Sequence, residues 1–438
     1  MMDPDLVEEE EEHHEVQQQP TIAKLPISES DGTSNSNSSS LSNSETWDIT
    51  RLDRCLEAQK AEAVVSHARD SLFHSRVAEA GDSLDITNFE TVVPRFTNSE
   101  IQLDNRLARG NFSDIYLIRN FSPSQSFKSC TEQQFYDTET VKKTFRPHEI
   151  VVKILRAKLV INPALFASGI ADLITEATLL AALDHPHIVA MRGRSIASID
   201  GFTSGKRDSF FILLERLHGT LEDGVARWKE RSADTGVMKR GIKGMQTFRL
   251  GMLLERIMVM SQLASAMAYL HDRNIIHRDL KQSNVGIDSA GRVKLCDFGL
   301  AKVLPVPNHD KEQFLLTANT GSLRYMAPEI GRGEKYNLKA DVYSFSILLF
   351  EIMNLSIVWQ GMNPQQVRQK VHCGSLRPTV SMFWPKSLKQ LMKSTWSDAP
   401  SARLSMRHVH NELDRVVEEL SVELSARNLA LIEANNSM

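Results

Sequence analysis

Side chains able to do chemistry gather in one short stretch of the chain. An HRDLKQSN segment begins at His277, and a DFG tripeptide begins at Asp297. Asn284 and the DFG aspartate offer amide and carboxylate oxygens, which hard cations such as Mg2+ prefer as ligands, and Asp279 offers a carboxylate that could accept a proton. Lys281 adds a positive charge two residues after Asp279. Alternatively, the Asp and Asn side chains lie on the surface and form hydrogen bonds only with water. That alternative does not explain why both residues occur at these spacings, each after a strand-like or helical run.

A second lysine lies in an apolar run. Lys153 is the one charged residue of IVVKIL, a segment that reads as a short buried strand. Burying an ammonium group without a partner is costly. The position therefore favours a functional lysine paired with an acidic residue. The alternative is a lysine whose aliphatic carbons lie along the strand while its ammonium group reaches solvent.

The order of these motifs resembles the eukaryotic protein kinases. DFG follows HRDLKQSN after 12 intervening residues, and APE, at Ala327–Glu329, follows after 27 more. The resemblance covers about residues 100–406. It implies an α+β, two-lobed protein-kinase-like fold, with a small strand-rich N-lobe and a larger helical C-lobe. The HRDLKxxN form, TGSLRYMAPE and the DVYSFSILLFEI segment from Asp341 are most similar to Ser/Thr kinases of the tyrosine-kinase-like group.

The resemblance also implies a role for each candidate catalytic residue. Asp279 would accept or orient the proton of the substrate hydroxyl, and Lys281 would steady the moving phosphate. Lys153 would pair with the nucleotide phosphates and with Glu176, on the helix that follows. The implied cofactors are ATP and Mg2+. The implied metal ligands are Asn284 and Asp297.

The expected nucleotide site combines a phosphate-covering loop, the strand of Lys153 and a hinge, LLERLHGTL. Its residues are Leu107, Ala108, Gly110, Ile115, Val151, Lys153, Glu215, Leu217, Asn284 and Asp297. The loop, LARGNFSDI, keeps only the second glycine of the family's GxGxxG, because Ala108 and Ser113 stand at the other two positions. Gly286 replaces the large apolar residue that usually floors adenine. Both departures predict weaker ATP binding.

The function implied is that of a protein serine/threonine kinase, which transfers the γ-phosphate of ATP to Ser/Thr hydroxyls of protein substrates in intracellular signalling. One alternative is a pseudokinase, a scaffold that binds partners without efficient phosphoryl transfer. A small-molecule kinase is a third reading, which the APE segment disfavours because it resembles machinery that holds peptides.

Two threonines are predicted phosphorylation sites. Thr317 and Thr320 lie between DFG and APE, where Arg278 of HRD often couples to a phosphate in the family. The alternative is that both are ordinary turn residues.

Other motif residues are expected to be structural. Glu329 and Arg403 resemble a buried ion pair of the family's large lobe, and Asp341 resembles the aspartate that holds the catalytic loop by backbone hydrogen bonds. The family also predicts an apolar stack in the active enzyme, made of Leu180, His277 and Phe298.

Composition divides the chain into four parts. Residues 1–46 are acidic and Ser/Asn-rich and read as a disordered tail, either partner-binding or merely solvated. Residues 47–97 read as a helical or partly ordered linker, 98–415 as the kinase domain and 416–438 as a C-terminal helical tail. Surface insertions are expected at 120–148, 200–209 and 229–246.

Periodicity predicts the main elements. Strands are expected near 101–103 and 115–117 and over 150–155 and 210–214, and a helix over 164–183. Apolar residues recur at helical spacing from residue 250, where the methionines are expected to be core. The apolar run 343–353 predicts a helix buried on nearly all sides.

Charge and cysteine content exclude several classes of protein. Lys plus Arg number 51 and Asp plus Glu 55 in 438 residues, a net charge of −4, which argues against nucleic-acid binding through bulk charge. The four cysteines are far apart, unlike a disulfide framework or a zinc site. The acidic N-terminus is unlike a secretory signal, and no apolar run reaches the roughly 20 residues of a membrane span. We expect a soluble, cytoplasmic protein, with nuclear entry also open to it, and no partner for the tail can be named.

Overall fold

The computed structural model describes residues 94–122, 146, 148–197, 202, 208–233, 241–305 and 312–436. The predicted acidic tail, the linker up to residue 93, and most of the 120–148 and 200–209 insertions lie outside these residues. The predictions made for them stay predictions.

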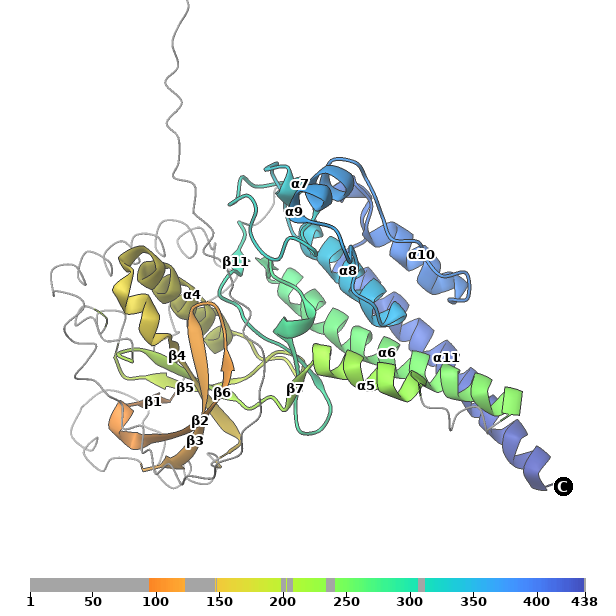
Figure 1. Cartoon of the computed structure of the whole chain (residues 1–438), viewed down its shortest axis with the longest axis horizontal. Coiled ribbons are helices and arrows are strands. Elements are labelled where there is room, and N and C mark those ends of the chain that lie inside the picture. The colour runs from red at the N-terminus through yellow and green to blue at the C-terminus, as the bar shows by residue number, and fades with distance from the viewer. Residues whose placement is uncertain are drawn as a thin grey trace, which may run out of the picture. The chain divides into compact units, whose positions relative to one another are not determined.

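A six-stranded sheet forms the strand-rich part, in the order β1-β5-β6-β4-β3-β2 (Figure 1). Only the β1–β5 pair is parallel. β4 is central, which explains why IVVKIL is apolar nearly throughout. The first strand lies within the predicted linker, so the sheet begins before residue 98. The strands are β1 (Arg95–Phe96), β2 (Ile101–Arg109), β3 (Ser113–Phe121), β4 (Ile150–Leu155), β5 (Met191–Ser195) and β6 (Phe211–Glu215).

One helix, α4 (Pro163–Ala182), packs against this sheet, close to the predicted 164–183. Asn162 caps it by accepting a hydrogen bond from the Leu165 amide at 3.1 Å, and proline occupies the first helical position. Phe166 and Ile170 are fully buried on its inner face. The same face carries Glu176 towards β4.

The helical part is built around α6 and α8. Ile257, Met260 and Met267 of α6 are fully buried, as the periodicity predicted, whereas Met258 is 44% exposed and is not core. Helix α8 is buried on nearly all sides, as predicted. The helices are α5 (Leu221–Ala233), α6 (Gly241–His271), α7 (Pro328–Gly331), α8 (Lys339–Asn354), α9 (Pro364–Val367), α10 (Lys386–Thr395) and α11 (Met406–Asn436).

Two small sheets position the chemistry-bearing loops. The antiparallel set β10-β9-β7 and the pair β11-β8 bracket them, so that HRDLKQSN lies between β8 and β9 and DFG lies between β10 and β11. A turn of 3-10 helix, Gln282–Asn284, ends the first loop. The strands are β7 (Gly219–Thr220), β8 (Ile275–Ile276), β9 (Val285–Ile287), β10 (Val293–Leu295) and β11 (Lys302–Val303).

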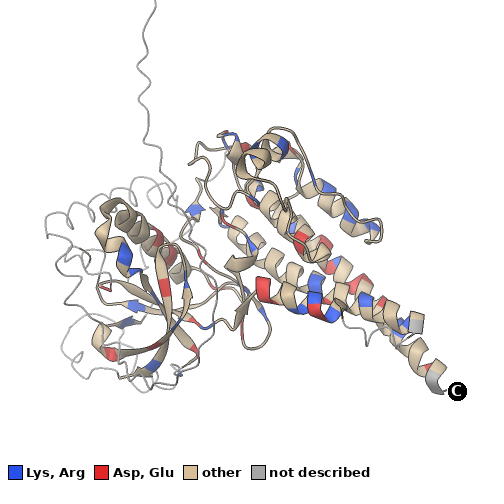
Figure 2. Ribbon diagram, in the orientation of Figure 1, with Lys and Arg blue, Asp and Glu red and all other residues tan. Residues whose placement is uncertain are grey.

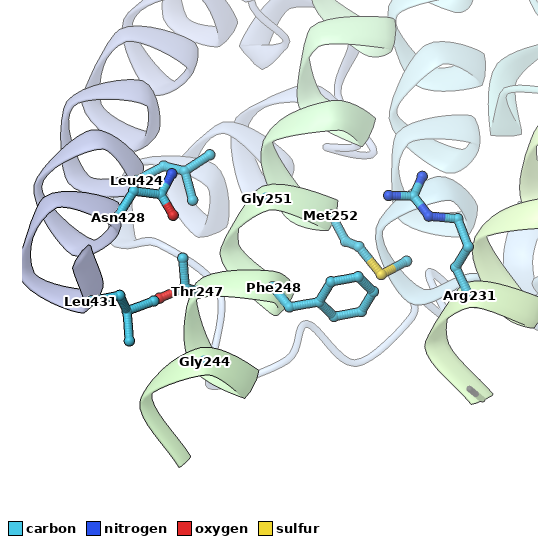
Figure 3. A pocket seen from close by; sticks show the side chains of 9 residues that line it. All are labelled: Arg231, Gly244, Thr247, Phe248, Gly251, Met252, Leu424, Asn428 and Leu431. Atoms are coloured by element: carbon cyan, nitrogen blue, oxygen red, sulfur yellow. The ribbon is translucent and has the colours of Figure 1, made fainter. Parts of the chain in front are cut away.

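Helix α11 packs along α6. It runs unbroken through residues 415 and 416, so the predicted boundary between kinase domain and helical tail falls inside one helix. Both ends of the 229–246 segment are helical, in α5 and α6, and most of their described residues are exposed. The expected surface insertion there stays a prediction. Between α5, α6 and α11 lies a pocket of about 450 Å³ (Figure 3). Its lining residues are Arg231, Gly244, Thr247, Phe248, Gly251, Met252, Leu424, Asn428 and Leu431.

Two helices, residues 163–182 and 242–271, have the length and hydropathy of a membrane span, but 56% and 50% of their apolar windows are buried. Their buried faces contact the sheet and the other helices, as those of core helices do. The expected absence of a membrane span stays a prediction.

Candidate functional site

Lys153 lies between two carboxylates. Its Nζ is 2.5 Å from Oε2 of Glu176 and 3.1 Å from Oδ1 of Asp297. The three residues come from β4, α4 and the loop between β10 and β11, so the ion pairs form only when all three elements are in place. Lys153 is 12% exposed and Glu176 is 2% exposed, whereas Asp297 is 49% exposed and faces outwards.

This arrangement keeps the lysine charged. Burial alone would lower the pKa of Lys153, but the carboxylates of Asp297 and Glu176 outweigh burial and raise it. The Lys153 ammonium lowers the pKa of Asp297, so that carboxylate is ionised at neutral pH. Burial raises the pKa of Glu176 and Lys153 opposes that effect. The site therefore presents a permanent ammonium beside an exposed carboxylate.

Asp279 is the centre of a second group of polar contacts. Its carboxylate accepts hydrogen bonds from Lys281 Nζ at 2.7 Å, from Asn284 Nδ2 at 3.0 Å and from Ser322 Oγ at 2.7 Å. The backbone N–H of Ser322 also donates to it, at 3.0 Å. Ser322 belongs to TGSLRYMAPE, so the segment before APE contacts the catalytic loop directly. Contacts that hold a carboxylate and a lysine together suit the transfer of a proton and of an anionic group.

Asp341, in the first turn of α8, holds this loop by its backbone. Its two oxygens accept from the amides of His277 at 2.8 Å and Arg278 at 2.9 Å. Burial alone would raise the pKa of Asp341, but the hydrogen bond from His271 and the other contacts lower it. Arg278 has a φ of 67°, a conformation that costs free energy and must be held by its surroundings. The predicted role of Asp341 as a backbone anchor is confirmed.

Two of the three residues of the predicted apolar stack contact each other. The rings of His277 and Phe298 meet edge to face with centroids 5.1 Å apart, and Leu180 and Phe298 belong to the same hydrophobic core.

Asp297 follows Cys296 with a φ of 64°, which turns its carboxylate towards Lys153. Burial raises the pKa of the Cys296 thiol to about 12, so this thiol is unreactive near neutral pH.

The donor set fits Mg2+ better than a transition metal. Asn284 uses its amide N–H groups on Asp279, which leaves its carbonyl oxygen as a metal ligand. Asp297 adds an exposed carboxylate. Among the described residues no three His, Cys, Asp or Glu side chains converge on one point. Mg2+ takes one or two protein oxygens and completes its octahedron with phosphates and water, so these two residues suffice.

The hinge, between β6 and β7, offers a backbone donor at Leu217. The amides on either side are used, since Arg216 donates to the Glu149 carbonyl at 2.8 Å and His218 to the Ile287 carbonyl at 2.7 Å. The Leu217 N–H donates to no described residue. Val151 and Ile115, on β4 and β3, belong to the apolar cluster, as a purine ring would require.

Gly286 and Leu217 fit together in a way the sequence did not indicate. A Cβ atom added at Gly286 would lie only 2.2 Å from Cδ1 of Leu217. The leucine therefore occupies the space that a larger residue at 286 would fill. The weaker ATP binding expected from Gly286 stays a prediction, and Leu217 supplies apolar volume beside that position.

The side chain of Glu215 is engaged by other parts of the fold. Its carboxylate accepts from the Ala190 amide at 2.9 Å and pairs with Lys294 Nζ at 2.8 Å. The side chain therefore fastens the start of the hinge to β10. The sequence did not predict this ion pair, because Lys294 lies among apolar residues with no motif around it.

The phosphate-covering loop is a tight turn between β2 and β3. The Gly110 amide donates to the Ser113 carbonyl at 2.7 Å. Arg156 donates to the carbonyls of Gly110 at 3.3 Å and Asn111 at 3.0 Å. Leu107 and Ala108 are exposed on β2, and the arginine that fastens the turn was not predicted.

The predicted phosphorylation sites differ in exposure. Thr317 is exposed, whereas Thr320 is half-buried and donates to the Thr317 carbonyl at 2.9 Å. Tyr336 connects this turn to the catalytic loop, because its hydroxyl donates to the Thr317 carbonyl at 2.9 Å and accepts from Arg278 at 3.5 Å. The phosphorylation itself stays a prediction.

Two buried carboxylates brace the helical part. The predicted pair of Glu329 and Arg403 is bidentate, at 2.6 and 2.8 Å, and almost completely buried. Glu351 of α8, which the sequence did not single out, accepts from Gln282 at 2.7 Å and from the Tyr325 hydroxyl at 2.6 Å. It thereby joins the catalytic loop to the segment before APE.

Comparison with known proteins agrees with this geometry. The family model described as protein tyrosine and serine/threonine kinase matches residues 101–413. A probable serine/threonine-protein kinase of Dictyostelium discoideum is 36% identical over 155 residues, which is 35% of this chain and 16% of that protein. Serine/threonine-protein kinase STY46 of Arabidopsis thaliana is 34% identical over 161 residues, 37% of this chain and 27% of that protein.

A longer match is with mitogen-activated protein kinase kinase kinase 7 of Drosophila melanogaster, 28% identical over 272 residues, 61% of this chain and 35% of that protein. This chain thus spans less than two thirds of the length of these relatives. The family match covers most of the chain and contains every residue of both polar groups, around Lys153 and around Asp279. The chain therefore belongs to the protein tyrosine and serine/threonine kinase family.

Proposed function

We propose that the chain is an active protein serine/threonine kinase that uses ATP and Mg2+. The observation that carries the proposal is the joint assembly of two groups, Lys153 with Glu176 and Asp297, and Asp279 with Lys281 and Asn284. Phosphoryl transfer requires little from the protein beyond positioning and charge stabilisation, and these residues supply both.

Each residue has a defined task in this proposal. Asp297 and Asn284 would hold Mg2+, which offsets phosphate charge when bound. Lys153, kept protonated by its two carboxylate neighbours, orients the nucleotide phosphates. Asp279 receives the proton of the substrate hydroxyl, and Lys281, 2.7 Å away, stabilises the anionic group in transit. No group needs a substitute, so nothing in the site favours the pseudokinase alternative.

Serine and threonine are the proposed acceptors. Lys281 in the HRDLKxxN form and the Ser322 hydroxyl on Asp279 support this choice, as do the names of the relatives. Protein substrates, a cytoplasmic location with nuclear entry open, and phosphorylation at Thr317 or Thr320 are parts of the same proposal.

The test is phosphosite mapping on the purified chain, incubated with Mg2+, ATP and a generic acceptor protein, beside Asp279→Asn. We expect phosphate on serine or threonine with the unmodified chain and transfer reduced at least about a hundredfold in the variant. Nucleotide binding should be similar in both proteins, since Asp279 is not a nucleotide ligand here. Equal transfer by both proteins, or phosphate on tyrosine alone, would contradict the proposal.

A further inference from the structure

One stretch of the helical part is strongly basic although the chain as a whole is slightly acidic. Residues 352–397 contain no Asp or Glu, while the net charge of the chain is −4. Every residue of this stretch is described by the structure. Its basic residues are Arg368, Lys370, Arg377, Lys386, Lys389 and Lys393.

Three of these lysines form a stripe on α10. At 100° per residue, Lys386, Lys389 and Lys393 fall within about 60° of one another around the helix axis. Figure 2 shows α10 with basic residues and no acidic one. The opposite face is buried in the core, through Leu388, Leu391, Met392 and Thr395.

Folding stability accounts for only part of this stripe. Lys386 and Lys389 lie at the start of α10, where the helix dipole favours negative charge and disfavours positive charge. The first turn holds no acidic residue to offset them. Lys389 gains one hydrogen bond within the fold, and Lys393 lies in the last turn, where positive charge is favoured. The position of Lys386 in the first turn has no such compensation among the described contacts, and a local rule broken in this way points to a function outside the fold.

The most exposed large apolar side chain among the described residues lies beside the stripe. Phe383 is 89% exposed and Met382 is 77% exposed. Lys389 Nζ donates to the Met382 carbonyl at 3.0 Å, which holds this pair against the first turns of α10.

The neighbouring residues Ser381 and Trp384 anchor the Met382–Phe383 pair. The next residue, Trp384, is buried with its ring centroid 5.9 Å from that of Phe350, and the Phe383 amide donates to Ser381 Oγ at 3.3 Å. The two exposed side chains therefore project from a segment that Trp384 anchors in the core.

We propose that this surface, the Met382–Phe383 tip with Lys386, Lys389 and Lys393, docks the chain on an anionic lipid bilayer. The apolar tip enters the boundary between headgroups and acyl chains, and the lysine stripe contacts the anionic headgroups. An acidic protein is the other candidate partner. A protein hot spot, however, is an anchor side chain that fills a pocket. A bilayer receives a projecting apolar side chain without a preformed pocket, so the high exposure of Phe383 and Met382 beside the lysines favours the bilayer.

The test is co-sedimentation of the full chain with vesicles of phosphatidylcholine alone and of phosphatidylcholine with phosphatidylserine. We expect binding only to the vesicles that contain phosphatidylserine, weakened by added salt. The variant Lys386→Gln/Lys389→Gln/Lys393→Gln should bind on the order of a hundredfold more weakly. That figure is about fivefold per lysine, the equivalent of about 1 kcal/mol per basic residue near an anionic surface. Phe383→Ser should weaken binding about tenfold or more.

Matched controls remove the same groups elsewhere. Arg227→Gln/Lys229→Gln/Lys243→Gln deletes three exposed positive charges from α5 and α6, and Ile242→Ser removes an apolar side chain that is 79% exposed. Both should bind vesicles within about twofold of the unmodified chain, since single charges and side chains far from the surface contribute little. All variants should phosphorylate a soluble acceptor equally, which separates lost docking from lost folding.

Three outcomes would overturn the proposal. One is equal binding to both kinds of vesicle or to neither. Another is a loss as large in the control variants as in the α10 variant. The third is binding to a soluble poly-glutamate peptide as tight as to the vesicles, together with no effect of Phe383→Ser, which would assign the surface to an acidic protein partner.

Discussion

Leu217 and Gly286 together occupy a volume that one larger residue usually fills. The hinge leucine lies where a Cβ atom at residue 286 would be only 2.2 Å from its Cδ1 atom and 3.0 Å from its Cγ atom. Such distances are far inside van der Waals contact, so the two positions are coupled. The floor of the proposed adenine site thus comes from the hinge instead of from β9.

This coupling predicts a rescue by exchange. Gly286→Leu alone overpacks the site, which typically costs about 1–3 kcal/mol, and should lower ATP affinity about tenfold or more. Leu217→Ala alone removes the floor and should also weaken binding. The double variant Leu217→Ala/Gly286→Leu restores one large and one small residue and should bind nearly as the unmodified chain does.

Titration with a fluorescent ATP analogue measures the nucleotide affinity of the unmodified chain, the two single variants and the double variant. The coupling free energy between the two substitutions should be about 0.5–3 kcal/mol and favourable, as for residues in direct contact. Losses that simply add in the double variant would show that the two side chains do not share the site. A thermal-denaturation control separates weak binding from poor folding.

At this scale the sequence predicts residues that carry motifs and misses those that meet across the fold. Asp279 and Lys153 could be picked out from their neighbours in the chain. The contacts of Leu217 with Gly286 and of Glu215 with Lys294 join segments separated by 69 and 79 positions. Neither contact leaves a local pattern, because the partner of each side chain is set only when the hinge pairs with β9 and β10 packs behind it.

Among the elements, α6 and α4 show how the surroundings of a glycine decide the effect of replacing it. A Cβ atom at Gly251 of α6 would meet only Leu424, at 3.9 Å, which is ordinary contact. A Cβ atom at Gly169 of α4 would meet Leu155 and Leu159 at 3.2 Å and Phe112 at 3.4 Å. Both glycines lie in helix interiors, where alanine is intrinsically favoured by about 0.5–1 kcal/mol.

These distances predict opposite results for two equivalent substitutions. Gly251→Ala should raise the free energy of unfolding by about 0.5–1 kcal/mol, since the methyl group enters free space near the α6–α11 pocket. Gly169→Ala should give no gain or a loss, because β4 and the phosphate-covering loop press against α4 there. The thermal unfolding midpoint of each variant is compared with that of the unmodified chain. An equal gain in both would mean that the helix propensity alone controls stability.

Element boundaries were predictable where capping and periodicity agree. Asn162 with Pro163 marks the start of α4, and IVVKIL coincides with β4. The start of α6 was missed, because Gly241 and Gly244 read as loop residues. That first part of α6 is stabilised by packing against α11, which is tertiary information.

Over the whole molecule, the net charge is small, but the charged residues are unevenly distributed along the chain. The net charge of −4 predicts no bulk electrostatic binding of nucleic acid, yet residues 352–397 lack any acid. The same stretch contains His372, which is 1% exposed and lies against α7 just after APE. A Cβ atom at Gly331 would be 2.0 Å from Nδ1 of this histidine, so the ring packs directly against the backbone of α7.

The loss of folding stability between neutral pH and about pH 5 should therefore depend on His372. Burial lowers its pKa, and the neighbouring Arg368, Arg332 and Arg377 lower it further. Below the unfolded value of about 6.5 the unfolded chain takes up a proton that the folded chain refuses, so stability falls as pH falls towards the lowered pKa. One such group contributes a slope of up to about 1.4 kcal/mol per pH unit. His372→Gln removes the titration, so urea midpoints measured from neutral pH down to about pH 5 should fall less steeply for the variant than for the unmodified chain. Parallel profiles would show that the charge on His372 is accommodated in the folded state.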